Sequence, residues 1–233
     1  MGEHAQRRLI RKLDLKRFLS TVAQQPNPQV RLEQYTVSEH LAANMLYIAA
    51  YTNDHVVGKS VLDLGCGTGR LALGASYLGA ESVIGIDIDR LAINTAHKNS
   101  EKVNLSQSVQ WILGDISAVR GHFDTVMQNP PFGVQTREAD RPFLAKALEV
   151  GDFIYSLHSH PEVDVRLIKQ LKASQDFLQV SASHFLEKFI AQHGGIVTAV
   201  YAMLMTIPRM FEFHTKLKHD FVVDLYIIKK KTP

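Results

Sequence analysis

The chain has 233 residues, of which 45% are apolar and 21% are charged. This composition is ordinary for one globular domain, and no apolar run approaches the roughly 18 residues that a membrane span requires, so we expect no membrane association. The formal net charge of +3 is only mildly basic and excludes a dedicated nucleic-acid coat protein.

Residues 1–58 are expected to form an N-terminal helical part. Apolar residues recur at helical spacing between positions 5 and 23, with arginines and lysines between them, which predicts a basic amphipathic helix. Pro26 and Pro28 break this helix. A second helix is expected over residues 38–51, with Ser38 placed to cap it.

Basic residues are concentrated at residues 7–17 and 229–231. Such clusters are typical of a solvated helix and tail, and also of phosphate contacts to nucleic acid, so the sequence leaves both interpretations open. The first cluster lacks the uninterrupted apolar segment of a secretory signal, and Cys66 is the only cysteine. We therefore expect an intracellular, cytoplasmic protein without an internal disulfide.

Residues 59–233 alternate between strand and helix patterns, which is typical of an α/β fold with a mostly parallel sheet and helices on both faces. The expected strands cover residues 60–64, 82–87, 109–113, 123–128, 153–157, 196–206 and 221–228. The expected helical segments cover residues 71–78, 91–102, 116–119, 141–150, 161–174 and 183–193. Because the last two of the seven strands are long and alternate in polarity, they predict an antiparallel edge. Together with the N-terminal part, these elements are expected to form effectively one domain.

A glycine-rich turn follows the first expected strand. The sequence from Val61 reads VLDLGCGTG, so an apolar strand runs into Gly65, Gly67 and Gly69 ahead of a helix. Glycines at these positions let the backbone pass close to a ligand. In the dinucleotide-binding pattern the third glycine comes one residue later, so this spacing disfavours NAD.

The motif Asn129-Pro130-Pro131-Phe132 follows the expected strand 123–128. It matches the pattern by which methyltransferases hold a planar amino group: a side-chain oxygen and a rigid backbone carbonyl accept from the N–H₂, and an aromatic face stacks on the base. Because this strand ends beside the glycine turn in an α/β order, the two motifs together predict S-adenosylmethionine and an amine substrate. The Rossmann-like fold of a class I S-adenosylmethionine-dependent methyltransferase is therefore expected.

Acidic residues stand at the ends of the first three expected strands. Asp63 is expected to orient the loop beneath the methionine moiety, Asp87 to accept both ribose hydroxyls, and Asp115 to accept from the adenine amine, with Ile88 and Ile116 flanking the ring. Any one of these carboxylates could instead be a helix cap or a surface charge. Three at successive strand ends favour a ligand site.

The catalytic chemistry expected of the motif needs orientation more than a strong base. The lone pair of an adenine amine is delocalised into the ring, and hydrogen bonds to the Asn129 side chain and the Pro130 carbonyl would aim that lone pair at the methyl donor. Phe132 would stack on a base that has been pulled out of its surroundings. Gly133, Arg137 and Arg141 follow in a polar loop that either orders around a nucleic acid or is plain solvent-exposed loop.

No metal site is expected. Cys66 has no cysteine or histidine partner at ligand spacing, and none of the eleven histidines shows a zinc pattern. We interpret Cys66 as a small residue packed in the loop, and His158 and His160 as polar residues at a strand end.

Four separated segments, in order, resemble the archaeal and eukaryotic small-subunit ribosomal RNA N6-adenosine methyltransferases. They are Leu32-Glu33-Gln34-Tyr35 with His40-Leu41-Ala42-Ala43, the Asn129-Pro130-Pro131-Phe132-Gly133 motif, Tyr155-Ser156-Leu157-His158, and Pro208 to Lys216 followed by Val223-Asp224-Leu225. The resemblance runs from about residue 32 to the C-terminus and does not include the basic helix. It implies S-adenosylmethionine as cofactor, S-adenosylhomocysteine as product, and an adenosine of small-subunit rRNA as substrate. In eukaryotes it also implies a small zinc-binding activator subunit that adds a strand to the sheet.

The resemblance further implies the roles of individual residues. The cofactor residues that it implies or supports are Gln34, Thr36, Asp63, Gly65, Gly67, Thr68, Gly69, Asp87, Ile88, Asp115, Ile116 and Asn129. The family commonly reads Glu-Gln-Tyr-Pro-Thr where this chain has Thr36-Val37 after Tyr35, so the residue that takes over the threonine contact is left open. Thr68 stands where eukaryotic members often have a second cysteine.

Three alternatives to rRNA methylation remain open on the sequence. A glutamine amide of a translation factor fits the same grip, although enzymes of that kind usually carry an extra N-terminal helical domain and a tyrosine in the motif. DNA adenine methylation is disfavoured because the chain has no room for a separate recognition domain. A non-catalytic scaffold is disfavoured by the two intact motifs.

Overall fold

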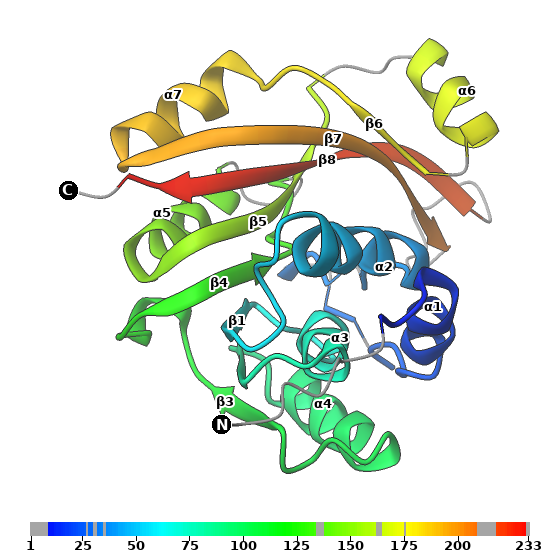
Figure 1. Cartoon of the computed structure of the whole chain (residues 1–233), viewed down its shortest axis with the longest axis vertical. Coiled ribbons are helices and arrows are strands. Elements are labelled where there is room, and N and C mark those ends of the chain that lie inside the picture. Colours follow the sequence, from blue (N-terminus) through cyan, green and yellow to red (C-terminus); the bar gives the residue numbers. More distant parts are fainter. Residues whose placement is uncertain are drawn as a thin grey trace, which may run out of the picture.

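The computed structural model of the chain describes residues 9–26, 28–29, 32–34, 36–133, 138–161, 165–174, 176–208 and 218–231. Its strands form one sheet (Figure 1) and are β1 (Ser60–Leu64), β2 (Ser82–Asp87), β3 (Val109–Leu113), β4 (Phe123–Gln128), β5 (Gly151–Ser159), β6 (Phe177–Gln179), β7 (Gly195–Pro208) and β8 (Lys218–Lys230). The helices are α1 (Lys12–Ser20), α2 (Glu39–Tyr47), α3 (Arg70–Leu78), α4 (Arg90–Lys102), α5 (Asp140–Val150), α6 (Val165–Ser174) and α7 (His184–Gln192). Two short segments are the π-helical η2 (Ile48–Thr52) and the 3₁₀-helical η3 (Ile116–Ala118).

The strand order is β3-β2-β1-β4-β5-β8-β7-β6. The strands from β1 to β5 pair in parallel, whereas β8, β7 and β6 each pair antiparallel with their neighbours. The predicted α/β sheet is confirmed, and the first four strands have the predicted bounds. The carboxyl ends of β1, β2 and β4 therefore meet at one edge, where open α/β sheets bind ligands.

The prediction of seven strands is wrong, because the sheet has eight. The additional strand, β6, has only three residues and pairs with Tyr201–Met203 of β7. A three-residue segment is too short to show alternation in a sequence. As a result β6 forms the antiparallel edge, and β7 and β8, which were expected there, lie inside the sheet.

The two faces of the sheet bury separate apolar clusters, because side chains alternate along each strand. In β1, Val61 belongs to the cluster on the face of α1, α2 and α3, whereas Leu62 and Leu64 belong to the cluster on the face of α5 and α7. Helices thus cover both faces, as the alternating pattern predicted. Figure 1 shows α1, α2 and α3 gathered together beside the sheet.

The N-terminal helices share their core with the sheet. Leu15 and Leu19 of α1 are fully buried in the same cluster as strand residues. By contrast, Leu9 and Leu13 are 67% and 53% exposed, so the predicted apolar face is narrower than expected. The predicted cap is confirmed, since Ser38 accepts from the backbone N–H of Leu41 at 3.2 Å. None of the described helices is long and apolar enough to cross a membrane.

Candidate active site

A cavity of about 950 Å³ opens at the carboxyl ends of β1, β2 and β4. Eleven of the predicted cofactor residues line it: Gln34, Thr36, Asp63, Gly65, Gly67, Thr68, Asp87, Ile88, Asp115, Ile116 and Asn129, and Pro131 joins them. Gly69, Pro130, Phe132, Gly133 and Arg141 are not among its lining residues, and Arg137 lies outside the described residues. The cavity therefore brings together predicted cofactor residues from the ends of four strands, β1 to β4, and from the N-terminal part.

The glycine turn after β1 holds its backbone in the left-handed region. The φ angles of Gly65, Gly67 and Gly69 are 75°, 54° and 84°, which only glycine adopts readily. At Gly69 an added Cβ would lie 2.4 Å from the Trp111 ring, so this glycine makes room for packing and not for a ligand. At Gly67 an added Cβ would meet no described atom within 4 Å, although Gly67 lines the cavity. Gly67 is thus the position where the backbone leaves space for a bound molecule.

Replacing Gly67 by alanine is expected to weaken cofactor binding more than it weakens folding. The methyl group would occupy cavity space, and the left-handed backbone would cost about 1–2 kcal/mol of folding free energy. The matched control is Gly58→Ala, because Gly58 also has a left-handed φ, 69°, and no atom within 4 Å of an added Cβ, but it does not line the cavity. Calorimetric titration with S-adenosylhomocysteine should show weaker binding for Gly67→Ala alone, and equal affinities would refute the prediction.

Asp87 ends β2 and is fixed by backbone donors. Its Oδ2 accepts from the N–H of Gly67 at 2.8 Å, and its Oδ1 accepts from the N–H of Asp89 at 2.9 Å. Burial raises the pKa of Asp87 above its ordinary value, and the backbone hydrogen bonds oppose that rise. Each carboxylate oxygen keeps further acceptor capacity, so the group can receive a diol while it holds the glycine turn in place.

Asp63 is 2% exposed at the end of β1. Its Oδ2 accepts from the N–H of Ala72 in the first turn of α3 at 2.9 Å. Burial raises the pKa of Asp63 from 3.8 to about 7, because the charged carboxylate is disfavoured away from water. A cationic group placed beside Asp63 would favour its charged form, which suits the ammonium of a methionine moiety.

Asp63 is expected to make stability fall as the pH rises. Between about pH 4 and 7 the folded protein keeps a proton on Asp63 that the unfolded chain has lost. The contribution of this proton to the free energy of unfolding is therefore fully present below pH 4, and it is lost as the pH rises through 7. An asparagine stays neutral, so Asp63→Asn should gain stability over the wild type by up to about 4 kcal/mol between these limits. Urea unfolding at pH 4.5 to 8 measures this difference, and parallel pH profiles would contradict it.

The predicted adenine end of the cavity is open to solvent. Asp115 is exposed and caps η3, where its Oδ1 accepts from the N–H of Ser117 at 2.8 Å. The hydrogen bonds to Ser117 hold the pKa of Asp115 below its ordinary value. Ile88 is 58% exposed although it lines the cavity. An exposed apolar side chain beside an ionised carboxylate suits a heterocycle with an exocyclic amine.

Gln25 and the described residues between positions 32 and 37 line the cavity, and buried polar groups that the sequence did not reveal bind this part of the chain. Asp89 accepts from the side-chain amides of Gln25 at 3.0 Å and Gln34 at 2.7 Å. Arg70 donates to the carbonyl of Val22 at 2.9 Å and to that of Val37. Gln34 therefore lines the cavity, and its amide N–H₂ donates to Asp89.

Asp89 and Arg70 were missed for different reasons. Asp89 follows Asp87 by two residues and also caps α4, so in the sequence it looks like an ordinary helix cap. Arg70 is 5% exposed, and arginine is almost never buried without partners, so a sequence predicts it on the surface. Its position directly after the third glycine of the turn was the available signal.

The catalytic motif extends from the end of β4. Asn129 and Pro131 line the cavity, so the predicted acceptor side chain and the glycine turn share one space. The ring of Phe132 packs edge-on against Phe221, with 5.7 Å between ring centroids, and does not line the cavity. Arg141 forms an ion pair with Glu138 and lies over the Phe185 ring at 4.4 Å. Phe132 and Arg141, which were predicted to contact the substrate, therefore do not line the cavity in this structure.

The cavity fits S-adenosylmethionine by its own chemistry. The hydroxyl of Thr68 is buried and has no hydrogen-bond partner among the described residues, and the backbone at Gly67 leaves room beside it. Asp87 and Asp115 offer acceptors at two separate depths, while Asp63 suits an ammonium. Burial raises the pKa of the Cys66 thiol well above its ordinary value, which agrees with a packed residue. The described residues contain no group of three metal-ligating side chains.

Comparisons with known proteins support this interpretation. Residues 40–130 match the family model of ribosomal protein L11 methyltransferase. The chain is 38% identical to an uncharacterized protein of Methanocaldococcus jannaschii, with 95% of each chain covered. It is 30% identical to the rRNA N6-adenosine-methyltransferase METTL5 of Danio rerio, over 91% of this chain and 95% of the relative. A crystal structure from Pyrococcus horikoshii, described as a candidate RNA methyltransferase, is 35% identical with a TM-score of 0.79 and covers 97% of this chain and 100% of that one.

Proposed function

The chain belongs to the family of rRNA N6-adenosine-methyltransferases that includes METTL5, and on this premise we propose that it transfers a methyl group from S-adenosylmethionine to N6 of an adenosine in small-subunit rRNA. Its fold is that of a class I S-adenosylmethionine-dependent methyltransferase, as the sequence predicted. The observation that carries the proposal is the position of Asn129 and Pro131 on the wall of the cavity that also contains Gly67 and Asp87. The predicted side-chain acceptor for an amine thus shares one space with the expected cofactor residues, and the Pro130 carbonyl directly follows it in the chain.

The residues of the motif would act by orientation. Bound S-adenosylmethionine supplies an electrophilic methyl group. The Asn129 side-chain oxygen and the Pro130 carbonyl accept the two hydrogens of the adenine amine, and the two prolines fix that carbonyl. This grip aims the nitrogen lone pair into the cavity and costs little reorganisation during transfer. Phe132 would have to leave Phe221, or share its ring face, in order to stack on the base.

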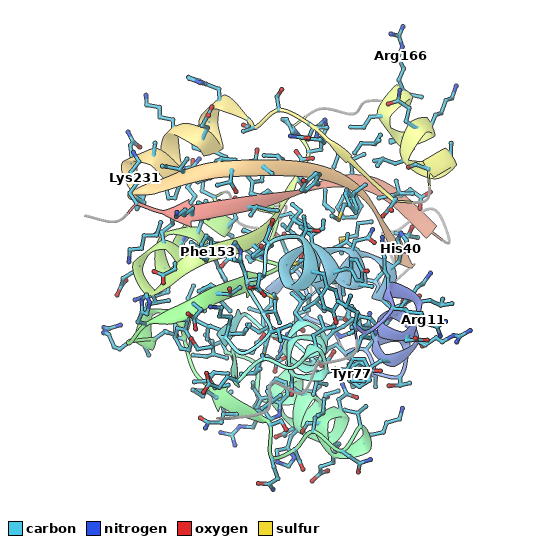
Figure 2. All side chains as sticks on the ribbon, viewed as in Figure 1. Arg11, His40, Tyr77, Phe153, Arg166 and Lys231 are labelled. Carbon is cyan, nitrogen blue, oxygen red and sulfur yellow. The ribbon has the colours of Figure 1, made fainter. Side chains whose placement is uncertain are left out.

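Basic side chains would supply the sequence-independent phosphate contacts. Arg11, which directly precedes α1, and Lys231, which directly follows β8, lie at opposite sides of the molecule (Figure 2), so the two basic clusters do not form one patch. Arg11 is also paired with Asp14 at 2.7 Å. Contacts near the cavity are therefore better placed than the chain ends to orient an RNA.

A small activator subunit, zinc-binding in eukaryotes, fits the outer edge of β3. This strand lies at the end of the sheet, and its Ile112 and Leu113 are each 43% exposed. An exposed edge strand with apolar side chains is a site where a partner can add a strand. Ile88, at 58% exposed, and Leu91, at 38%, extend the apolar surface.

The purified chain should be incubated with tritiated S-adenosylmethionine and, separately, with rRNA, tRNA, DNA and a translation-factor extract. N6-methyladenosine in small-subunit rRNA is the expected product after digestion to nucleosides. Label confined to protein would replace the rRNA substrate with a glutamine amide, and label in DNA would replace it with DNA adenine. Full activity of the chain alone would contradict the activator subunit and leave the rRNA substrate unaffected.

A further inference from the structure

Four buried or half-buried side chains form one hydrogen-bonded chain beneath the catalytic motif. Nε2 of Gln128 lies 2.8 Å from Oγ of Ser156, which lies 2.8 Å from Nε2 of His158. Nδ1 of His158 lies 3.0 Å from Oδ2 of Asp140. Gln128 and Ser156 are 0% exposed and His158 is 2% exposed, so water does not compete for these bonds.

The chemistry of the groups fixes the direction of these hydrogen bonds. Burial raises the pKa of Asp140, but the hydrogen bond to His158 opposes this rise, and the pKa lies below its ordinary value. An ionised Asp140 requires a proton on Nδ1 of His158, and in a neutral ring this leaves Nε2 as an acceptor. The Ser156 hydroxyl then donates to Nε2 and accepts from the amide of Gln128. Each of the three hydrogen bonds then has one donor and one acceptor, and the donors run in order from Gln128 through Ser156 and His158 toward Asp140.

The arrangement has the atom order of a Ser-His-Asp nucleophilic triad, but it cannot act as one. Ser156 is fully buried, already accepts from Gln128, and does not line the cavity. A nucleophilic serine needs an open approach for its substrate. We therefore interpret these hydrogen bonds as holding parts of the backbone in position.

This series of hydrogen bonds connects the residue before the catalytic motif with the first residue of the next described helix. Gln128 is the last residue of β4 and directly precedes Asn129, while Asp140 is the first residue of α5. Gln128 is the register partner of Ser156 on β5. His158 lies two residues further along β5, beyond the end of β4, and reaches α5. The backbone that leaves the sheet at Asn129 and the helix that follows are thereby tied to one strand.

We propose that Gln128, Ser156, His158 and Asp140 form a positioning relay that fixes the Asn129-Pro130 acceptor pair against the cavity. This proposal rests on the proposed function, because it assigns the relay to the same methyl transfer. None of the four relay residues lines the cavity, and none of the three hydrogen bonds of the relay involves Asp87 or Gly67. The relay should therefore govern the rate of transfer and leave cofactor affinity unchanged.

Two substitutions of His158 separate its two bonds. In His158→Asn the amide reaches the position of Nδ1 and keeps the bond to Asp140, whereas in His158→Gln it reaches the position of Nε2 and keeps the bond to Ser156. A relay needs both bonds, so each variant should lower kcat for rRNA methylation at least tenfold. The dissociation constant of S-adenosylhomocysteine should stay within twofold of the wild-type value.

The matched control is His160→Gln. His160 is the next residue on the same side of the chain, and its Nδ1 contacts both carboxylate oxygens of buried Asp224 at 2.9 Å, but it makes no bond to the relay. Its kcat should equal that of the wild type. Unchanged kcat in both His158 variants, or equal losses of kcat in His160→Gln, would overturn the relay.

The same measurements separate the relay from the substrate proposal. If the wild type methylates a substrate other than rRNA, kcat is measured on that substrate, and the relay is still tested. A loss of cofactor affinity together with kcat in the His158 variants would indicate a general structural role and would also overturn the relay. Ser156→Ala provides an independent variant of the central link, with the same expected tenfold loss of kcat.

Discussion

The Asn129→Ala variant is expected to lose methyl transfer by a factor on the order of 10²–10³ in kcat and to lose far less of its cofactor affinity, because Asn129 is one of many residues that line the cavity. Asn129 lines the cavity at the end of β4 and is the only predicted side-chain acceptor for the substrate amine. Removing one preorganised hydrogen-bonding group from a transition state has this effect, because orientation supplies much of the rate of a reaction without a strong base. Steady-state transfer from tritiated S-adenosylmethionine measures kcat, and a single-turnover experiment measures the rate constant of the methyl-transfer step itself.

Two measurements make this result specific to the acceptor role. The control Asn94→Ala removes an exposed asparagine of α4 and should leave kcat unchanged. The affinity of Asn129→Ala for S-adenosylhomocysteine shows whether its cavity is intact. An Asn129→Ala variant with intact affinity and a kcat within threefold of the wild type would rule out the amine grip, whereas a loss of both would point to misfolding.

The sheet could be predicted from the sequence where periodicity and turn signals agree. The strands that end at Leu64, Asp87, Leu113 and Gln128 were predicted to the residue, because each is a largely apolar run with a glycine or a polar residue at or directly after its end. Strand β6 could not be predicted, because three residues carry no period. Its partners on β7, Tyr201–Met203, lie 22 to 26 residues later in the chain, and such long-range pairing leaves no local signal.

The residues of the candidate site also differ in whether a local sequence signal was available to predict them. Asp63, Asp87 and Gly67 were predicted because each follows a strand in a recognisable spacing, and all three line the cavity. Arg70 and the pairing of Asp89 with two glutamines could not be predicted, because these bonds join positions 33 to 64 residues apart that meet only in the folded chain. Local spacing thus predicted residues that line the cavity, and tertiary contacts decide what holds the neighbouring segments in place.

The Asp87→Asn variant is expected to weaken binding of S-adenosylmethionine by about 100-fold, the largest effect on affinity that the cavity predicts. The asparagine lacks the charge that would strengthen hydrogen bonds from two ribose hydroxyls. Its amide N–H₂ would also face the backbone N–H of Gly67 or Asp89, where the carboxylate now accepts a hydrogen bond. Because a hydrogen bond to a charged group contributes about 1.5–3 kcal/mol, the substitution costs at least one such bond. Calorimetric titration measures the dissociation constant. Asp152→Asn, at an exposed site on β5 where the carboxylate lies 3.1 Å from His122, is the control and should bind normally. If Asp87→Asn binds within threefold of the wild type, Asp87 is not the ribose anchor, and its two backbone hydrogen bonds serve only to shape the glycine turn.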